Sequence, residues 1–98
     1  MSRPAPFILQ ATGHGTMIVN RHDYKMVDEQ SGFGVGWQLM TTSWCERQET
    51  ELLAHLLRLR RKHHGDGVMA VDCGANIGTV TVSMASACTD WGRVLAFE

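Results

Sequence analysis

The segment from Val68 to Phe97 constrains the fold more than any other part of the chain. It begins with the short apolar run Val68–Val71, continues through a glycine-containing loop, and ends with the apolar run Gly92–Phe97. A short continuous apolar run is typical of a strand that is covered on both faces, as in a parallel sheet. Parallel strands need a crossover connection, and the residues between these two runs have the length of a helix. The segment therefore predicts a β-α-β unit.

The predicted crossover helix carries Ile77, Val80, Met84 and Cys88 on one face. Residues 79–82 are Thr-Val-Thr-Val, and the propensity of four consecutive β-branched residues favours a strand. We still expect a helix, because the glycine loop before these residues and the turn after them fit the connection of a β-α-β unit.

Glycines in the loop from Asp72 to Gly78 and an acid after the second strand are features of a nucleotide-binding site. Glycine lets the backbone approach a ligand closely. A carboxylate at the tip of the second strand accepts hydrogen bonds from ribose hydroxyls. Glu98 stands twenty residues after Gly78, which is the distance at which such an acid is expected.

The spacing within the loop distinguishes two kinds of nucleotide. The dinucleotide pattern G-x-G-x-x-G, begun at Gly74, requires two further glycines where the chain has Asn76 and Thr79. The pattern acid-x-G-x-G-x-G of S-adenosylmethionine (SAM) enzymes fits from Asp72 to Gly78, with Asn76 as its one departure. Asparagine tolerates unusual backbone angles and offers an amide. Since SAM carries an ammonium and no phosphate, Asp72 either faces that ammonium or hydrogen-bonds the loop itself.

These residues resemble a known family. The sequences VDCGANIG (71–78) and GRVLAFE (92–98) resemble motif I and the acidic strand end of class I SAM-dependent methyltransferases, and the D-x-G-A-N-I-G form resembles the FkbM family in particular. Gly34–Leu39 and the leucine- and arginine-rich segment after it also resemble the N-terminal extension of one FkbM subgroup. The resemblance in the motifs covers about a third of the chain.

The resemblance implies a Rossmann-like, seven-stranded α/β fold that transfers a methyl group from SAM, commonly to a hydroxyl oxygen. By matching position, Asp72, Gly74, Asn76 and Gly78 would line the methionine and ribose side of SAM, and Glu98 would hold the ribose. The resemblance assigns neither a catalytic base nor a methyl acceptor to these residues.

The chain stops directly after the predicted strand that ends at Phe97, without a turn or polar tail. We therefore expect residues 43–98 to be the start of the methyltransferase domain, truncated after its first β-α-β unit. Residues 1–42 are expected to form a β-rich extension. Half of the donor pocket and the whole acceptor site would then be absent, so we expect little or no activity from this chain alone.

The extension is expected to contain a β-hairpin between Phe7 and Asp23, because two apolar runs flank the glycine-bearing loop Thr12–Gly15. The next stretch, Ser31–Trp37, has glycines at alternate positions and is expected to be irregular or to form a strand and a turn.

A helix is expected after the extension. Ser43 and Glu46 have the spacing of a capping box, and Thr50 is an alternative start. Leucines recur at intervals of three and four residues, acids precede bases along the segment, and His63–Gly67 supplies the stop, with glycine suited to a left-handed C-cap.

Composition excludes several classes of protein. Nine Lys and Arg against ten Asp and Glu give a net charge of -1, which argues against a nucleic-acid or acidic-membrane partner. No apolar run approaches the length of a membrane span, and the apolar stretch near the N-terminus is too short for a secretory signal. Oligomeric state is not readable from the sequence.

The cysteines and histidines suggest neither a disulfide framework nor a metal site. Cys45, Cys73 and Cys88 are odd in number and form no C-x-x-C pair, so a reducing, cytoplasmic compartment is expected. The adjacent pair His63 and His64 has no third ligand at a suitable spacing.

Two other functions stay open at this point. The same fold with a different ligand would make the chain the start of a nicotinamide- or flavin-binding oxidoreductase, although Asn76 and Thr79 count against it. A small non-enzymatic α+β interaction module is the other, and it would use the basic run from Arg58 to His64.

Overall fold

A computed structural model describes residues 5–98, so the first four residues of the predicted extension lie outside the described part. The chain divides into two compact units, Met1–Cys45 and Glu46–Glu98. Each unit combines helix and strand, and the described strands form three separate two-stranded sheets. The protein therefore belongs to the α/β class in the broad sense.

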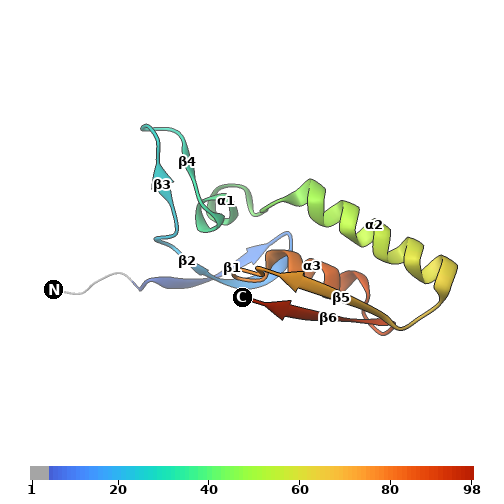
Figure 1. Ribbon diagram of the computed structural model, residues 1–98. Coiled ribbons are helices and arrows are strands. Elements are labelled where there is room, and N and C mark those ends of the chain that lie inside the picture. Colours follow the sequence, from blue (N-terminus) through green and yellow to red (C-terminus); the bar gives the residue numbers. More distant parts are fainter. Residues whose placement is uncertain (1–4) are drawn as a thin grey trace. The chain divides into compact units, whose positions relative to one another are not determined.

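The first unit begins with the predicted hairpin, which is confirmed. Strands β1 (Phe7–Thr12) and β2 (Gly15–Asn20) pair antiparallel, with Phe7 opposite Asn20 and Thr12 opposite Gly15 (Figure 1). Because successive side chains of a strand point to opposite faces, one face of the hairpin is buried. The core of this unit consists of four buried side chains, Met17, Val19, Leu39 and Cys45.

The stretch after the hairpin is only partly as predicted. Strands β3 (Lys25–Met26) and β4 (Gly32–Phe33) form a short antiparallel pair, and helix α1 (Val35–Thr42) follows at once. The expectation of irregular or strand-and-turn structure up to Trp37 is right for β4 and wrong for α1. The amide of Gly36 donates to Oδ2 of Asp23 at 3.1 Å. This acceptor lies 13 residues earlier in the chain, so no local capping signal marks the helix start.

A buried histidine ties the hairpin to the end of the first unit. His14 is 5% exposed, its Nε2 accepts a 3.1 Å hydrogen bond from the backbone amide of Cys45, and its ring meets that of Trp44 edge to face. Trp44 also covers Gly13, where an added Cβ would lie 2.0 Å from the indole ring. Burial lowers the pKa of His14 below its ordinary value.

The predicted start of the long helix is wrong, because α2 spans Arg47–His64. Ser43 is not an N-cap: it has a left-handed φ of 64° and ends α1, with its amide donating to the Leu39 carbonyl. Glu46, the expected third helical residue, instead precedes α2 with a φ of 53° and makes no side-chain cap hydrogen bond. Thr50, the alternative start, is buried inside the helix.

The predicted end of that helix is confirmed. Gly65 has a φ of 78°, a conformation that glycine adopts easily, and its amide donates to the carbonyl of Arg61. Arg60 donates to the Gly65 carbonyl at 2.7 Å. Arg61 pairs with Asp66 at 2.8 Å and lies 4.9 Å over the ring of Trp91. The basic end of α2 is thus partly occupied by contacts within its own unit.

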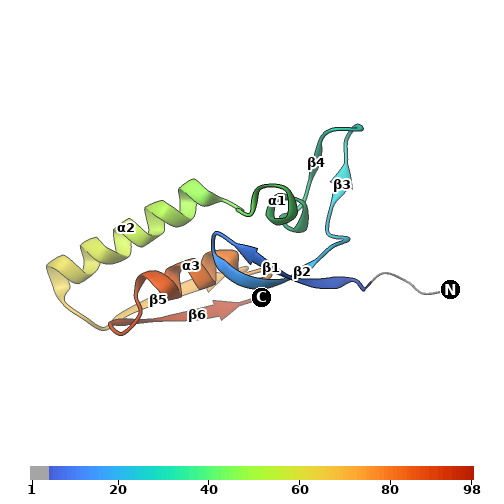
Figure 2. The same cartoon turned by 180° about the vertical axis from the view of Figure 1, so that it is seen from behind.

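The predicted β-α-β unit is confirmed. Strand β5 (Val68–Cys73), helix α3 (Thr79–Ala87) and strand β6 (Gly92–Phe97) follow one another, and the two strands pair in parallel (Figures 1 and 2). The helix forms despite the strand propensity of its β-branched residues because its apolar side is buried against the rest of the unit. Met84 and Cys88 pack with Val68 of β5 and Leu57 of α2 in the core of this unit.

The two faces of the β5–β6 sheet differ. Helix α3 contacts both strands on one face, and α2 packs against α3. The opposite face exposes Met69, Val71, Leu95 and Phe97. Within the described residues, the two strands are therefore covered on one face, and the other face is an exposed apolar surface.

Gly92 permits the close contact between α3 and the strands. A Cβ at this position would lie 2.4 Å from Cγ1 of Val68 and 2.9 Å from Cβ of Cys88. Both distances are shorter than carbon atoms tolerate, so no larger residue fits without a shift of its neighbours.

No helix within residues 5–98 is long and apolar enough to cross a membrane. Cys45, Cys73 and Cys88 form no disulfide within residues 5–98, and of the three Cys73 is exposed.

Candidate functional site

The loop between β5 and α3 has an alternating backbone conformation. Gly74, Asn76 and Gly78 have positive φ angles of 81°, 54° and 97°. These are the three positions at which the pattern acid-x-G-x-G-x-G places glycine. Asparagine is one of the few L-residues that visit the left-handed region routinely. Asn76 therefore takes the backbone role of the middle glycine, which explains why the departure at this position is tolerated.

The surface above the two glycines is open. A Cβ built on Gly74 or Gly78 would meet no atom within 4 Å. Crowding by the rest of the protein is thus not the reason for glycine at either position. Glycine is required there by the positive φ angle, and the loop backbone stays accessible to a ligand from that side.

Asp72 is half-buried on the face of β5 that α3 covers. Its Oδ2 accepts a 2.6 Å hydrogen bond from the hydroxyl of Thr81. This partner lies in the helix after the loop and not in the loop itself, so the bond is a third role that the sequence did not indicate. An ionised carboxylate has about four acceptor sites, so one hydrogen bond leaves Asp72 with capacity for a ligand.

The end of β6 is tied to the same loop. The carbonyl of Phe97 accepts hydrogen bonds from the amides of Gly74 at 2.7 Å and Ala75 at 2.9 Å. Glu98 follows Phe97 directly and is exposed. The acidic residue that the sequence predicts at the strand tip therefore lies at the same edge of the sheet as the loop.

The five residues predicted as a site thus lie at one place, the edge at which β5 and β6 both end: Asp72, Gly74, Asn76, Gly78 and Glu98. Two groups that shape this edge were not predicted, the hydroxyl of Thr81 and the carbonyl of Phe97. The signal for Thr81 is its place in the first turn of α3, because that turn follows the loop and packs on the strand carrying Asp72. The carbonyl of Phe97 belongs to the backbone, so the identity of the residue does not indicate its role.

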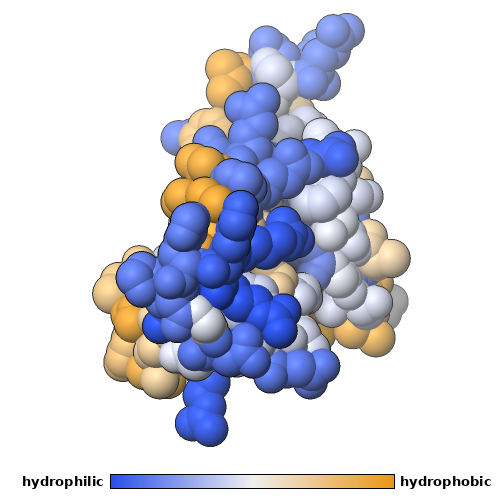
Figure 3. Space-filling view, turned by 90° about the vertical axis from the view of Figure 1, so that its right-hand side faces the viewer, coloured by the Kyte–Doolittle hydropathy of each residue, from blue (hydrophilic) through white to orange (hydrophobic). Residues whose placement is uncertain are grey.

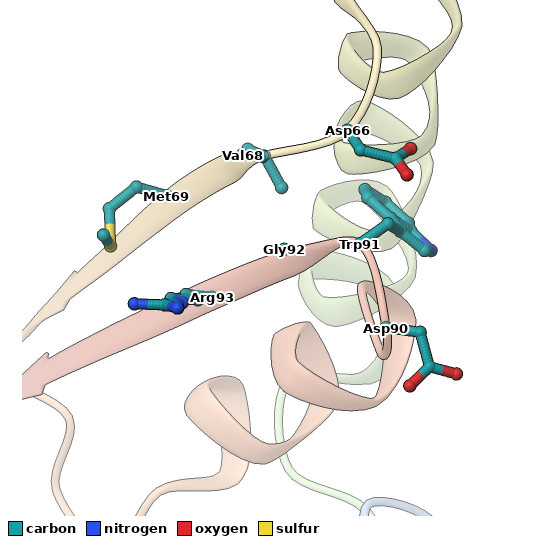
Figure 4. Close-up of a pocket in the computed structure, with 8 residues that line it drawn as sticks. Asp66, Val68, Met69, Asp90, Trp91, Gly92 and Arg93 are labelled. Atoms are coloured by element: carbon teal, nitrogen blue, oxygen red, sulfur yellow. The ribbon is translucent and has the colours of Figure 1, made fainter.

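A depression of about 600 Å³ lies at the opposite edge, where the two strands begin. Figure 4 shows Asp66 and Asp90 on either side of Trp91, with Met69 and Arg93 further along the strands. Ligands of open parallel sheets bind outside the carboxyl ends of the strands, and this depression lies at the amino ends. One of the residues that line it, Asp66, already forms an ion pair with Arg61 within the second unit.

Within residues 5–98, no three His, Cys, Asp or Glu side chains are grouped so that they could hold a metal ion. Comparison of the chain with models of protein families, with curated proteins and with solved structures gave no match.

Proposed function

We propose that this chain binds SAM at the edge formed by the Asp72–Gly78 loop and Glu98, as the donor side of a class I methyltransferase of the FkbM type with a Rossmann-like fold. One observation carries the proposal. The three positive φ angles at alternate loop positions occur in a β-α-β unit whose second strand ends beside the loop and is followed by a carboxylate.

The chemical groups at this edge match those of SAM. The carboxylate of Asp72 suits the ammonium of the methionine moiety, and the carboxylate of Glu98 suits the ribose hydroxyls. The open backbone at Gly74 and Gly78 accommodates a ligand that lies across the loop. A dinucleotide would instead bring its pyrophosphate close to the negative charge of Asp72, which disfavours that class of ligand.

SAM held at this edge would supply an electrophilic methyl group for transfer to an acceptor oxygen, with S-adenosylhomocysteine as the leaving group and the hydroxyl proton passing to a base or to water. The residues of this chain contribute by holding the donor in one orientation, which is a major source of rate acceleration. O-methyl transfer and a reducing, cytoplasmic setting belong to the same proposal. The acceptor and the catalytic base are not assigned.

The two other functions have less support. A nicotinamide- or flavin-dependent oxidoreductase would place a pyrophosphate at this loop and would bind NAD in preference to SAM. An interaction module would use the basic end of α2, where Arg60 and Arg61 already bond to Gly65 and Asp66.

Equilibrium dialysis of the purified chain against SAM, S-adenosylhomocysteine and NAD, each at millimolar concentration, tests the proposal. We expect both sulfur ligands to bind and NAD to bind more weakly. Asp72→Asn keeps an oxygen that accepts from Thr81 but removes the charge, and Glu98→Gln removes the strand-end charge. Each is expected to weaken binding by about 10-fold or more, since a hydrogen bond to a charged group contributes roughly 1.5 to 3 kcal/mol and about 1.4 kcal/mol corresponds to tenfold in affinity.

The matched control is Glu29→Gln, which changes the net charge equally at an exposed residue of the other unit. It is expected to leave the affinity unchanged. Circular dichroism of every variant distinguishes loss of binding from loss of fold. Absence of binding to SAM and S-adenosylhomocysteine by the folded chain, or equal weakening by the control, would rule the proposal out.

A further inference from the structure

Helix α2 has a second apolar face in addition to the one that packs in its unit. Leu53 and Leu57 belong to or pack against the core of the second unit. Leu52, Leu56 and Leu59 are 56%, 49% and 37% exposed. Their spacing of four and three residues places them in one stripe along the helix. Around the helix, the stripe is displaced from the buried Leu57, by about 100° at Leu56 and about 160° at Leu59, at 100° per residue.

The leucine stripe continues at both ends with charged or polar residues of the same spacing. Glu49 precedes Leu52 by three positions, and His63 follows Leu59 by four. The five positions from Glu49 to His63 thus repeat every three and four residues, which is the spacing of the seam between two paired helices. The seam is apolar in its middle and carries an acid at one end and an imidazole at the other.

Charge is separated along the same helix. Residues 46–51 contain three glutamates and one arginine, whereas residues 58–62 contain four basic residues and no acid. Figure 3 faces the end of the molecule where α2 terminates, and hydrophilic residues gather there beside hydrophobic ones at the surface. Two such helices side by side in parallel would bring like charges together. In the antiparallel orientation each acidic end meets a basic end, and the helix dipoles oppose each other favourably.

We propose that the leucine stripe of α2 is an interaction surface for α2 of a second copy of this chain, with the two helices antiparallel about a two-fold axis near Leu56. Glu49 and His63 both lie seven residues from Leu56, or about 10 Å along the axis. Glu49 of each copy therefore lies near His63 and Lys62 of the second copy. The same patch serves both copies, as a two-fold interface requires.

A dimer built on one helix from each copy has a small interface. Such interfaces fall below about 1,200 Å² and associate weakly. We expect dimers to form at concentrations of roughly tens to hundreds of micromolar. The proposal is independent of the SAM site, because none of the residues from Glu49 to His63 belongs to that site.

Sedimentation equilibrium of the whole chain over this concentration range is the first test. The mean mass is expected to rise from 10.9 kDa towards twice that value. Leu56→Glu puts a charge on the proposed axis and is expected to raise the dimer dissociation constant by more than about 10-fold. Circular dichroism should show unchanged helix content, because Leu56 is half-exposed. The matched control is Leu95→Glu, at a leucine of 47% exposure on the open sheet face. It should leave the dimer intact.

A charge exchange tests the orientation. Lys62 is used because Arg60 and Arg61 take part in contacts at the helix end. Glu49→Lys alone and Lys62→Glu alone are each expected to weaken the dimer by about 3-fold, as exposed ion pairs do. The double variant is expected to recover most of the loss, since the antiparallel arrangement brings the two positions together. A monomer at every concentration, loss of the dimer only in Leu95→Glu, or no recovery in the double variant would overturn the proposal.

Discussion

The hydroxyl of Thr81 donates a 2.6 Å hydrogen bond to the carboxylate of Asp72. Asp72 lies near the end of β5 and Thr81 in the first turn of α3, so the bond joins the two elements on either side of the glycine loop. Since Asp72 is half-buried, the bond is shielded in part from water. It therefore restrains the loop at both of its ends.

Thr81→Val removes this hydrogen bond and keeps the β-branched shape of the side chain. We expect the free energy of unfolding to fall by about 1 to 2 kcal/mol, because the acceptor is charged and loses its partner. Urea denaturation followed by circular dichroism measures the change. Thr89→Val, which removes an exposed hydroxyl bonded to backbone carbonyls, should cost less than about 0.5 kcal/mol. Equal effects of the two substitutions would show that the bond has no special role.

Substitutions at Asn76 test whether the positive φ angle at this position affects the stability of the second unit. Its φ of 54° costs most L-residues roughly 1 kcal/mol or more, so Asn76→Ala is expected to destabilise the second unit by about that amount. Asn76→Gly should be neutral in stability, because glycine adopts positive φ freely. Urea denaturation of both variants is the measurement. A stable Ala variant would contradict the left-handed conformation at this position.

Gly92 is expected to be intolerant of substitution for a different reason. In Gly92→Ala the new methyl group would clash with Val68 and Cys88, and overpacking of this kind costs about 1 to 3 kcal/mol. Val68→Ala makes room on one side. The thermodynamic cycle formed by the two substitutions should therefore show that their combined cost is less than the sum of the separate costs. Strict additivity in denaturation experiments would mean that the two residues do not meet.

The stability of the first unit should depend on pH through His14. Burial lowers its pKa below the ordinary value of 6.5, so the unfolded chain binds a proton more readily than the folded one. The contribution of neutral His14 is complete above the unfolded pKa of 6.5 and is lost as the pH falls through the lower folded pKa. Protonation of Nε2 would also remove the acceptor for the Cys45 amide.

Denaturation of the chain at a series of pH values between 5 and 8 measures this effect. We expect the free energy of unfolding to decrease towards the acidic end in the wild-type chain and to decrease less in His14→Gln, whose side chain does not titrate. Asp28 also has a lowered pKa, through hydrogen bonds from the Gln30 amide, the Ser31 side chain and the Ser31 amide. Its contribution is lost below its ordinary pKa of 3.8, outside this range. The same decrease in both proteins would assign the dependence to other groups.

The second unit could be predicted from the sequence more fully than the first. Its strands, its crossover helix and the end of α2 follow from signals a few residues long, such as the apolar run at Val68–Val71 and Gly65 after a basic turn. No local signal indicates helix α1, because its capping group, Asp23, lies far away in sequence. The start of α2 differs from the predicted one because Ser43 and Glu46 have the spacing of a capping box but adopt left-handed conformations.

In the candidate site, too, features with a local sequence signal could be predicted and features that depend on distant residues could not. The positions of Asp72, Gly74 and Gly78 follow from the spacing of residues along the chain. The tie between the loop and Phe97 depends on the parallel register of the strands, which sets Cys73 opposite Phe97. A register of this kind is a tertiary property, so no pattern in the sequence encodes it directly.

The most direct test of the proposed SAM site is an amide-resolved NMR titration of the ¹⁵N-labelled chain with S-adenosylhomocysteine. The account predicts that shift changes concentrate on the amides of Gly74, Asn76, Gly78 and Glu98, and that Asp72→Asn reduces them without altering the spectrum of the first unit. A spectrum of the folded chain that does not change at millimolar ligand, or changes centred on Gly67 and Trp91 at the opposite edge of the sheet, would contradict it.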